Sequence, residues 1–300
     1  MTSGFKKDKP RILVTGSEGF VGQRLLVLLK QSGYAVATAD LRQGFDVTNW
    51  EQLQTLMPFD TAVHLAAKVF VPAAYRHPRN FYHANVVGTL NMLELCRLNG
   101  AKLIFASSYV YGSPRYLPID EGHPLQSVNP YSESKIMGER LCSRYHTDFG
   151  LRVVILRPFN IFGPAQNDAF LIPNILKQLE EKGSVRLKDP APRRDFVYVD
   201  DVAEAFLAAI RFEDSPFEIF NIGSGTSFSV QEIAEEIIHQ AGASDAVLAF
   251  SHEQRHAEIQ DCLAEISKAK KILQWHPRTD IRDGILACLR NGRKQFPATR

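Results

Sequence analysis

The stretch "ILVTGSEGFVG", residues 12–22, runs from a short apolar segment into glycines at positions 16, 19 and 22. Ile12–Thr15 is typical of a buried strand, and Gln23–Ser32 carries apolar residues at helical spacing. A strand, a glycine-rich turn and a helix in this order are typical of a dinucleotide-binding unit. Gly16 then permits the tight turn, Gly19 the approach of a pyrophosphate and Gly22 the packing of helix on strand. The helix N-terminus offers free N–H groups to the phosphates.

An acidic residue ends the next strand-like segment, where "VATAD" closes at Asp40. A carboxylate at this place accepts hydrogen bonds from a ribose diol and repels a 2′-phosphate. The pattern therefore favours NAD over NADP as the cofactor, while Arg42 keeps NADP as the alternative.

Strand-like and helix-like segments alternate through the first half of the chain, which predicts a parallel sheet covered on both faces. We expect an α/β protein with a Rossmann-type doubly wound sheet and a smaller C-terminal α/β substrate domain. The expected strands are residues 12–15, 35–39, 62–66, 103–106 and 151–156, and the main helices are residues 23–32, 50–57, 78–99 and 130–149. The cofactor domain is expected over residues 1–160 with a later return near 196–223, and the substrate domain mainly over 161–300.

Composition points to an ordinary globular protein, with 300 residues, 45% hydrophobic, 23% charged and a formal net charge of +2. This balance gives no reason to expect a nucleic-acid or membrane partner. No segment reaches the roughly 18 apolar residues of a membrane span, and the first residues lack a secretory pattern. The cysteines show no metal-ligand spacing, so we expect a reduced, metal-free, cytoplasmic protein; they are Cys96, Cys142, Cys262 and Cys288.

The segment "NPYSESKIMGER" places Tyr131 and Lys135 four residues apart near the start of a predicted helix, on one face. A free tyrosine has a pKa near 10 and is a poor base at neutral pH. An ammonium group one turn away stabilises the phenolate, and lowering the pKa by about three pH units requires roughly 4 kcal/mol. This pair is the candidate catalytic group.

Two hydroxyls follow another predicted strand, where "FASSYVYG" places Ser107 and Ser108 directly after Leu103–Ala106. Ligands of a doubly wound sheet bind at the carboxyl ends of its strands. We therefore expect these hydroxyls on the cofactor side, although side chains at strand ends also complete local hydrogen bonds.

Together these segments resemble the extended short-chain dehydrogenase/reductase family, which contains nucleotide-sugar epimerases, dehydratases and reductases. The likeness covers most of the chain, and its motifs occur in the family's order: "TGSEGFVG", "HLAA", "NVVGTLNMLELCR", "SSYVYG", "YSESK", "RPFNIFGP", "RRDFVYVDDVAEA", "FNIGSG" and "ISKAKKILQWHP". The resemblance implies that Tyr131 transfers a proton, that Lys135 is its partner, and that Ser107 is the catalytic hydroxyl.

The resemblance also implies two sets of binding residues. The expected cofactor contacts are Gly16, Ser17, Glu18, Gly19, Phe20, Val21, Gly22, Asp40, Leu41, Arg42, Asp46, Val47, Leu65, Ala66, Ala67, Lys68, Asn85, Tyr131, Lys135 and Pro158. The expected substrate contacts are Ser108, Tyr109, Asn160, Arg194 and Arg255. Among these, the asparagine and the two arginines match positions that meet the nucleotide diphosphate, a bidentate task suited to guanidinium.

The chain departs from its dehydratase relatives directly after the catalytic serine. Sugar-nucleotide 4,6-dehydratases have an acidic pair where this chain has Ser108 and Tyr109, so the acid and base for elimination are absent. The resemblance then implies hydride transfer at a ring carbon, C4 above all, of a nucleotide-activated sugar. A 4-epimerase is favoured, with a 4-keto-sugar reductase as the alternative, and a 4,6-dehydratase or a non-catalytic dinucleotide-binding regulator ranks below both.

Relatives of this kind often dimerise through two helices of the cofactor domain. The matching helices here are residues Pro78–Asn99 and Pro130–Phe149. The resemblance therefore implies a homodimer held by a four-helix bundle.

Overall fold

The computed structural model describes residues 9–253 and 259–293, which form two compact units. Of the described residues, the first unit comprises 9–107, 129–156 and 206–219, and the second comprises 108–128, 157–205, 220–253 and 259–293. How these units correspond to a cofactor domain and a substrate domain stays a prediction.

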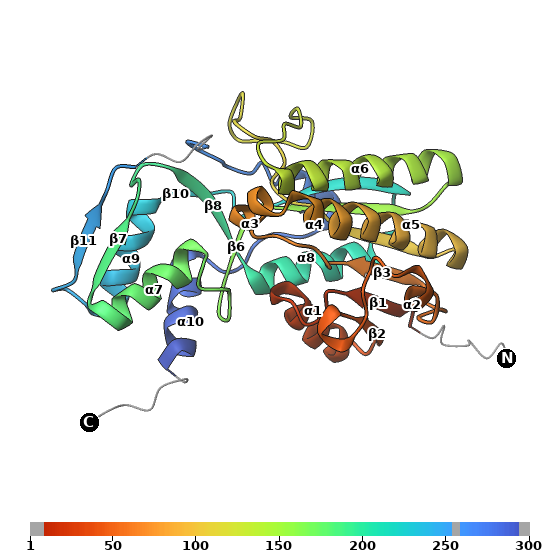
Figure 1. The fold of residues 1–300 in the computed structure, drawn as a ribbon, viewed down its shortest axis with the longest axis horizontal. Coiled ribbons are helices and arrows are strands. Elements are labelled where there is room, and N and C mark those ends of the chain that lie inside the picture. The colour runs from red at the N-terminus through yellow and green to blue at the C-terminus, as the bar shows by residue number, and fades with distance from the viewer. Residues whose placement is uncertain (1–8, 254–258, 294–300) are drawn as a thin grey trace. The chain divides into compact units, whose positions relative to one another are not determined.

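The first unit is built on a sheet with the strand order β2-β1-β3-β4-β5-β9 (Figure 1). The strands are β1 (Arg11–Thr15), β2 (Ala35–Ala39), β3 (Thr61–His64), β4 (Lys102–Ala106), β5 (Val153–Pro158) and β9 (Phe217–Ile222). The first five pair in parallel, and the order reverses beside β1, where the chain steps first to β2 and later to β3 on its other side. The predicted doubly wound parallel sheet is confirmed, and β9 joins its edge as the sequence indicated.

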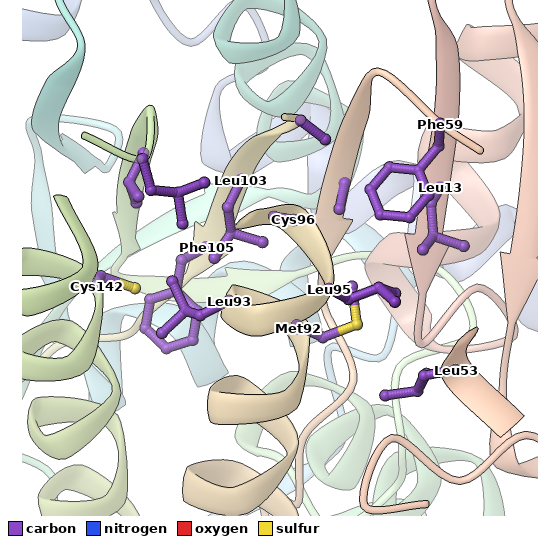
Figure 2. Close-up of a cluster of buried hydrophobic side chains, with 14 of the residues drawn as sticks. Leu13, Leu53, Phe59, Met92, Leu93, Leu95, Cys96, Leu103, Phe105 and Cys142 are labelled. Carbon is purple, nitrogen blue, oxygen red and sulfur yellow. The ribbon is translucent and has the colours of Figure 1, made fainter. Parts of the chain in front are cut away.

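Helices cover both faces of this sheet, with α1 (Phe20–Gln31) on one face and α4, α5 and α6 side by side on the other (Figure 1). Apolar side chains alternate along each strand, so odd-numbered residues such as Leu103 and Phe105 of β4 face α5 (Gly88–Asn99) and α6 (Pro130–Phe149). Figure 2 shows this core, where Leu13 of β1 and Met92, Leu93 and Cys96 of α5 are fully buried with them.

Gly138 brings α6 close to the sheet. A Cβ atom at this position would lie 2.7 Å from Cζ of Phe105, closer than side chains tolerate. The helix ends at Gly150, which adopts the left-handed backbone (φ 66°), and the N–H groups of Gly150 and Leu151 donate to the last carbonyls of His146 and Tyr145. Asn129 begins it with a capping box to Ser132. The bounds Pro130–Phe149 match the sequence prediction, and the helix that carries the Tyr–Lys pair is fixed at both ends.

The single helix predicted over residues 78–99 is interrupted in the structure. α4 (Pro78–Tyr82) and α5 (Gly88–Asn99) are joined by a π-helical turn, η2 (His83–Val87), which contains the buried Asn85. Periodicity of apolar residues cannot reveal such a turn, because one wider turn leaves most of the helical spacing intact. Turns of this type are common at functional sites. The shorter elements of this unit are η1 (Leu41–Gln43), α2 (Trp50–Gln54) and α3 (Val71–Arg76).

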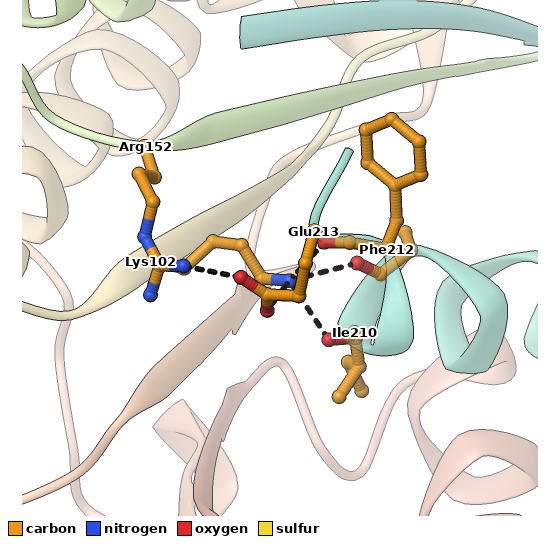
Figure 3. Close-up of polar contacts among 6 residues, drawn as sticks. Lys102, Arg152, Ile210, Phe212 and Glu213 are labelled. Atoms are coloured by element: carbon orange, nitrogen blue, oxygen red, sulfur yellow. Dashed lines mark hydrogen bonds and ion pairs between the residues drawn. The ribbon is translucent and has the colours of Figure 1, made fainter. Parts of the chain in front are cut away.

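Lys102, the first residue of β4, is buried, and its side chain binds the C-terminal end of α8 (Val199–Arg211) (Figure 3). Its Nζ donates to the carbonyl oxygens of Ala209, Ile210 and Phe212 at 3.2, 2.8 and 2.7 Å and lies 2.9 Å from Oε1 of Glu213. A cation at this place suits the negative end of the helix dipole and satisfies carbonyls that have no partner within the helix. Burial lowers the pKa of Lys102, while its bond with Glu213 acts in the opposite direction.

The second unit has two small sheets. One has the order β10-β8-β6, built from β6 (Asn160–Phe162), β8 (Arg193–Tyr198) and β10 (Ser227–Ser229), and the other pairs β7 (Ser184–Leu187) with β11 (Val247–Phe250). Its helices are α7 (Leu171–Lys182), α9 (Val230–Ala241), α10 (Ile281–Arg293) and the π-turn η3 (Ala269–Leu273). In the described ranges, no helix combines the length and the apolar character that crossing a membrane requires.

Candidate active site

Predicted site residues of the first unit directly follow the carboxyl ends of neighbouring strands. Gly16 follows β1, Asp40 follows β2, Leu65 follows β3 and Ser107 follows β4. These four strands are adjacent in the sheet and run in parallel. The structure therefore brings the predicted cofactor and catalytic residues to one edge, at the place where the strand order reverses and where ligands of such sheets bind.

The glycine-rich turn is shaped by contacts within the chain itself. Gly16 has left-handed backbone (φ 70°), and its N–H donates to the carbonyl of Ala39 at 2.9 Å. A Cβ atom on Gly16 would lie 2.6 Å from the amide nitrogen of Ala66, and one on Gly22 would lie 2.2 Å from the Gly16 carbonyl oxygen. No side chain fits at either position, because the backbone of the turn lies against the loop after β3 at Gly16 and against α1 at Gly22.

Two features of this turn fit a bound pyrophosphate. Gly19 begins α1 without a side-chain cap, and the first turn of the helix contains no acidic residue, so its N–H groups and dipole favour an anion. Oγ of Ser17 is buried and has no hydrogen-bond partner among the described residues. A dinucleotide's phosphates supply the acceptors that both features lack. The residues present therefore fit the cofactor that the sequence predicts.

Asp40 is buried at the end of β2 and joins this turn to the next loop. Its carboxylate accepts from the backbone N–H of Glu18 at 3.0 Å and of Arg42 at 2.9 Å. The Arg42 guanidinium in turn donates to the Glu18 carbonyl at 2.9 Å. Asp40 and Arg42 thus hold the turn from two sides, whereas Leu41 between them is exposed. Further along, Asp46 accepts from the backbone and hydroxyl of Thr48 in its own loop.

Asn85 holds the loop that follows β3. Its amide accepts from the N–H of Lys68 at 2.8 Å and donates to the carbonyl of the same residue at 3.0 Å, and it also donates to Ser134 of α6 at 2.8 Å. The π-turn η2 places this buried side chain between loop and helix. The sequence predicted a cofactor contact for Asn85, and the structure shows it supporting the loop 65–68, whose residues are predicted cofactor contacts too.

His64 opens the motif "HLAA" but is not among the predicted site residues. It is buried at the end of β3, with Nδ1 2.7 Å from Oγ1 of Thr15 and Nε2 3.3 Å from Oγ1 of Thr89. Thr15 accepts from the N–H of Ala66, and Thr89 donates to the carbonyl of Asn85, so the proton of His64 belongs on Nε2. Burial lowers the pKa of His64 to about 3, and the Lys135 charge acts in the same direction. The imidazole is therefore neutral. It joins the end of β1, just before the glycine turn, to the first turn of α5.

Lys135 is buried on α6, one turn after Tyr131, which is half-buried. Its Nζ donates to the carbonyl of Ala106 at 2.7 Å and lies 5.1 Å from the centre of the Phe105 ring. Burial lowers the pKa of Lys135 to about 8, while Cys142 and Glu139 raise it. The ammonium group is thus held at the carboxyl end of β4, on the helix face that it shares with Tyr131.

Ser107 follows β4 and points toward the same helix. Its hydroxyl donates to Oε1 of Glu139 at 2.5 Å, and both side chains are buried. Glu139 was not among the predicted site residues. The signal was present in the sequence as the spacing of four from Lys135 to Glu139, which repeats the spacing from Tyr131 to Lys135.

The predicted substrate residues that the structure describes belong to the second unit. The Tyr109 hydroxyl donates to the carbonyl of Gly112 at 2.5 Å, and its ring packs edge-on against Tyr111 and Phe159. Burial raises the pKa of Tyr109. Ser108, which precedes it, is half-buried.

Asn160 and Arg194 support neighbouring backbone within this unit. Asn160 donates to the carbonyl of Asp195 at 3.2 Å, and Arg194 donates to the carbonyls of Arg193 and Ile259 at 2.8 and 2.6 Å. Pro158 ends β5. Arg255 lies outside the described residues. The substrate roles of these side chains remain predictions.

The sheet and the glycine turn define a dinucleotide-binding protein, and α6 holds Lys135 of the predicted Tyr–Lys pair at the same edge of the sheet. Residues 12–223 match the NAD dependent epimerase/dehydratase family, and the chain belongs to this family. A protein of Methanocaldococcus jannaschii, named as a proposed UDP-glucose 4-epimerase, is 33% identical over 91% of this chain and 95% of its own length.

Two further relatives differ in the activity that their names give. The GDP-6-deoxy-D-mannose reductase of Pseudomonas aeruginosa is 29% identical over 93% of this chain and 96% of its own. The structure of UDP-glucose 4-epimerase from Thermus thermophilus in complex with NAD superposes with a TM-score of 0.85 at 28% identity, covering 95% of this chain and 100% of that one.

Proposed function

We propose that this chain is an NAD-dependent enzyme that acts on the sugar ring of a nucleotide-activated sugar, as a 4-epimerase. The observation that carries the proposal is the buried Lys135 ammonium, held on the Ala106 carbonyl one helical turn from Tyr131 at the edge of the sheet that bears the glycine turn. The M. jannaschii and T. thermophilus relatives, both named for 4-epimerase activity, support this type of reaction.

The cofactor is NAD. The turn from Gly16 to Gly22 and the Ser17 hydroxyl would hold its pyrophosphate, and Asp40 would meet the ribose hydroxyls. Bound NAD supplies the hydride acceptor and donor for the ring carbon. A carboxylate rather than a cation at residue 40 supports NAD over NADP. The NAD in the T. thermophilus structure agrees with this preference.

Three residues of the chain remove, return and position the proton of the reacting oxygen. Tyr131 as phenolate takes the proton of the C4 hydroxyl and later returns it. Lys135 stabilises the phenolate through its charge, which burial makes more effective because the surroundings screen it less. Ser107 contacts the reacting oxygen and fixes its position. We infer these roles from the placement of the three residues at one edge of the sheet.

The state of Tyr109 supports an epimerase over a 4,6-dehydratase. Elimination requires a group that gives or takes a proton near neutral pH at this position. The Tyr109 hydroxyl is committed to the Gly112 carbonyl, and burial raises its pKa further from that range. Ser108 has no acidic proton either.

A 4-keto-sugar reductase is the second candidate. The P. aeruginosa relative named as a GDP-6-deoxy-D-mannose reductase favours it, because it aligns over nearly the whole chain. Both activities use the same proton donor, and they differ in whether the reduced cofactor stays through a full cycle or leaves.

Nuclear magnetic resonance of candidate substrates in deuterated water tests the function. An epimerase is expected to convert UDP-glucose, UDP-galactose or their N-acetyl forms at C4 without added cofactor and without deuterium entering the ring, because the hydride returns internally. Deuterium at C5 with loss of the 6-hydroxyl would identify a dehydratase. Conversion only of a 4-keto sugar with added NADH or NADPH would identify a reductase.

We further propose a homodimer in which α4–α5 and α6 of each copy form a four-helix bundle. These helices expose apolar side chains, including Leu90 (40% exposed) and Met137 (37%). They also border a hollow of about 350 Å³, lined by Arg79, Tyr82, His83, Val86, Val87 and Met137. Apolar surface of this kind favours burial against a second copy.

The double change Leu90→Glu/Met137→Glu is expected to convert the dimer to a monomer, because four carboxylates would be buried at the interface. Light scattering after size-exclusion chromatography measures the mass. The control is Val27→Glu on α1, which is 52% exposed outside this surface and is expected to leave the dimer intact. A monomeric parent protein would rule out the bundle.

The first unit is proposed to bind the cofactor and the second to bind the nucleotide sugar, since the two sets of predicted residues fall mainly in these units. A reducing, cytoplasmic setting is proposed as well. The four cysteines are free and buried, as expected of a protein that folds without disulfides.

A further inference from the structure

We propose that Glu139 is a positioning residue of the active site, which accepts the hydrogen bond of the Ser107 hydroxyl and places a negative charge behind Lys135, and so sets how readily Tyr131 ionises. The proposal rests on the proposed function for its meaning in catalysis. Titration of the Tyr131 hydroxyl, which tests the proposal, does not require turnover.

The geometry places three functional groups along one line of α6. Tyr131, Lys135 and Glu139 are spaced by four residues, so they occupy successive turns of one helix face. The second and third of them both reach the end of β4, where Lys135 donates to the Ala106 carbonyl at 2.7 Å and Glu139 accepts from Ser107 at 2.5 Å. Ala106 and Ser107 at the end of β4 are thus held by Lys135 and Glu139, which lie on successive turns of α6.

The hydrogen bond to Glu139 determines whether the Ser107 hydroxyl can donate to a ligand or only accept from it. A serine hydroxyl has one proton and two lone pairs. Because the proton is directed at the Glu139 carboxylate, the remaining lone pairs of Ser107 meet the reacting group as acceptors. The backbone N–H of Ser107, which donates to the Leu156 carbonyl at 2.8 Å, holds the residue in place. Ser107 is therefore arranged to accept from a sugar hydroxyl or from the Tyr131 hydroxyl.

Among the described residues, the titratable groups around this line include Lys135 and Cys142 of α6, His64 of β3 and Cys96 of α5. Burial raises the pKa of both thiols and lowers that of His64, so these three groups are neutral near pH 7. The negative charge of Glu139 raises the pKa of Lys135 against the larger effect of burial.

The sign of the effect on Tyr131 follows from electrostatics. A nearby negative charge disfavours loss of a proton and raises the pKa of every neighbouring acid. Replacing Glu139 by glutamine therefore lowers the pKa of both Tyr131 and Lys135. Eight helical residues span about 12 Å, and one charge at that distance in a partly screened interior changes a pKa by about one pH unit.

Titration of the tyrosinate absorbance in the near ultraviolet measures this directly. The chain has 9 tyrosines, so Tyr131 is isolated by subtracting the curve of Tyr131→Phe from that of the parent, and likewise in the Glu139→Gln background. The pKa of Tyr131 is expected to fall by about one pH unit in Glu139→Gln. The pH profile of kcat/KM, wherever turnover is found, is expected to move to lower pH with it.

Asp148→Asn is the matched control, since it removes the same charge from the same helix at an ion pair with Arg144 far from Tyr131. It is expected to leave the Tyr131 titration unchanged. If Glu139→Gln does not fold, Ser107→Ala/Glu139→Met removes the charge together with the hydroxyl that donates to it, and Ser107→Ala alone is its reference.

An unchanged or raised pKa of Tyr131 without the Glu139 charge overturns the proposal, as does an equal shift in Asp148→Asn. A fall in this pKa together with no conversion of any nucleotide sugar would support the role of Glu139 while the proposed function failed. The two ideas are therefore separable.

Discussion

Tyr131→Phe is expected to lower kcat/KM by about 10²- to 10⁴-fold, the range that a positioned general acid–base contributes. The phenyl ring keeps the packing of the side chain but removes the hydroxyl that exchanges the proton. NAD binding is expected to persist, because the glycine turn and Asp40 are untouched. Steady-state kinetics and the amount of NAD bound after gel filtration measure both quantities.

Tyr145→Phe is the matched control for this change. Tyr145 lies on the same helix and donates to Glu94 at 3.3 Å, toward the opposite end of α6. Its loss is expected to leave kcat/KM within about twofold, because no proton of the reaction passes through it. If Tyr131→Phe kept full activity, Tyr131 would not be the proton donor, and the assignment of the site would have to change.

Lys102→Met is expected to lower the free energy of unfolding by about 2–4 kcal/mol. The change leaves the carbonyls of Ala209, Ile210 and Phe212 without the donor that serves all three in the buried end of α8. Relief from burying an ammonium group offsets part of this cost, which keeps the loss below the sum of three unsatisfied groups. Urea denaturation at neutral pH measures the change.

Glu213→Gln is the control that removes the ion pair with Lys102 and leaves the hydrogen bonds from Lys102 to the carbonyls in place. The Glu213 side chain is 57% exposed, so its ion pair with Lys102 is expected to contribute about 1 kcal/mol or less. Equal stability of Lys102→Met and the parent protein would show that the contacts of Figure 3 do not stabilise the end of α8.

Local patterns in the sequence predicted most of the first unit. The glycine turn after Ile12–Thr15, the alternation of strands and helices, and the bounds of α6 from Pro130 to Phe149 all follow from short-range spacing and capping residues. In doubly wound sheets, a glycine-rich turn that binds a dinucleotide follows the strand at which the strand order reverses. The turn after β1 therefore predicted that the order reverses beside β1.

Contacts between distant segments were not predictable in the same way. Lys102 begins a strand, and nothing near it in the sequence indicates that the end of a helix about 100 residues later supplies its acceptors. The partners of His64 and of Glu139 also come from other elements, so neither the "HLAA" motif nor the helical spacing from Lys135 to Glu139 revealed these contacts. The π-turn at Asn85 depends on the loop and helix that its side chain joins.

The most direct test of the central claim is to purify the protein without added nucleotide, denature it and quantify the NAD that is released. The proposed epimerase keeps its reduced cofactor through a whole cycle, and its glycine turn is proposed to hold the pyrophosphate, so about one NAD per chain is expected. Protein that releases no NAD and binds neither added NAD nor NADH would contradict the account.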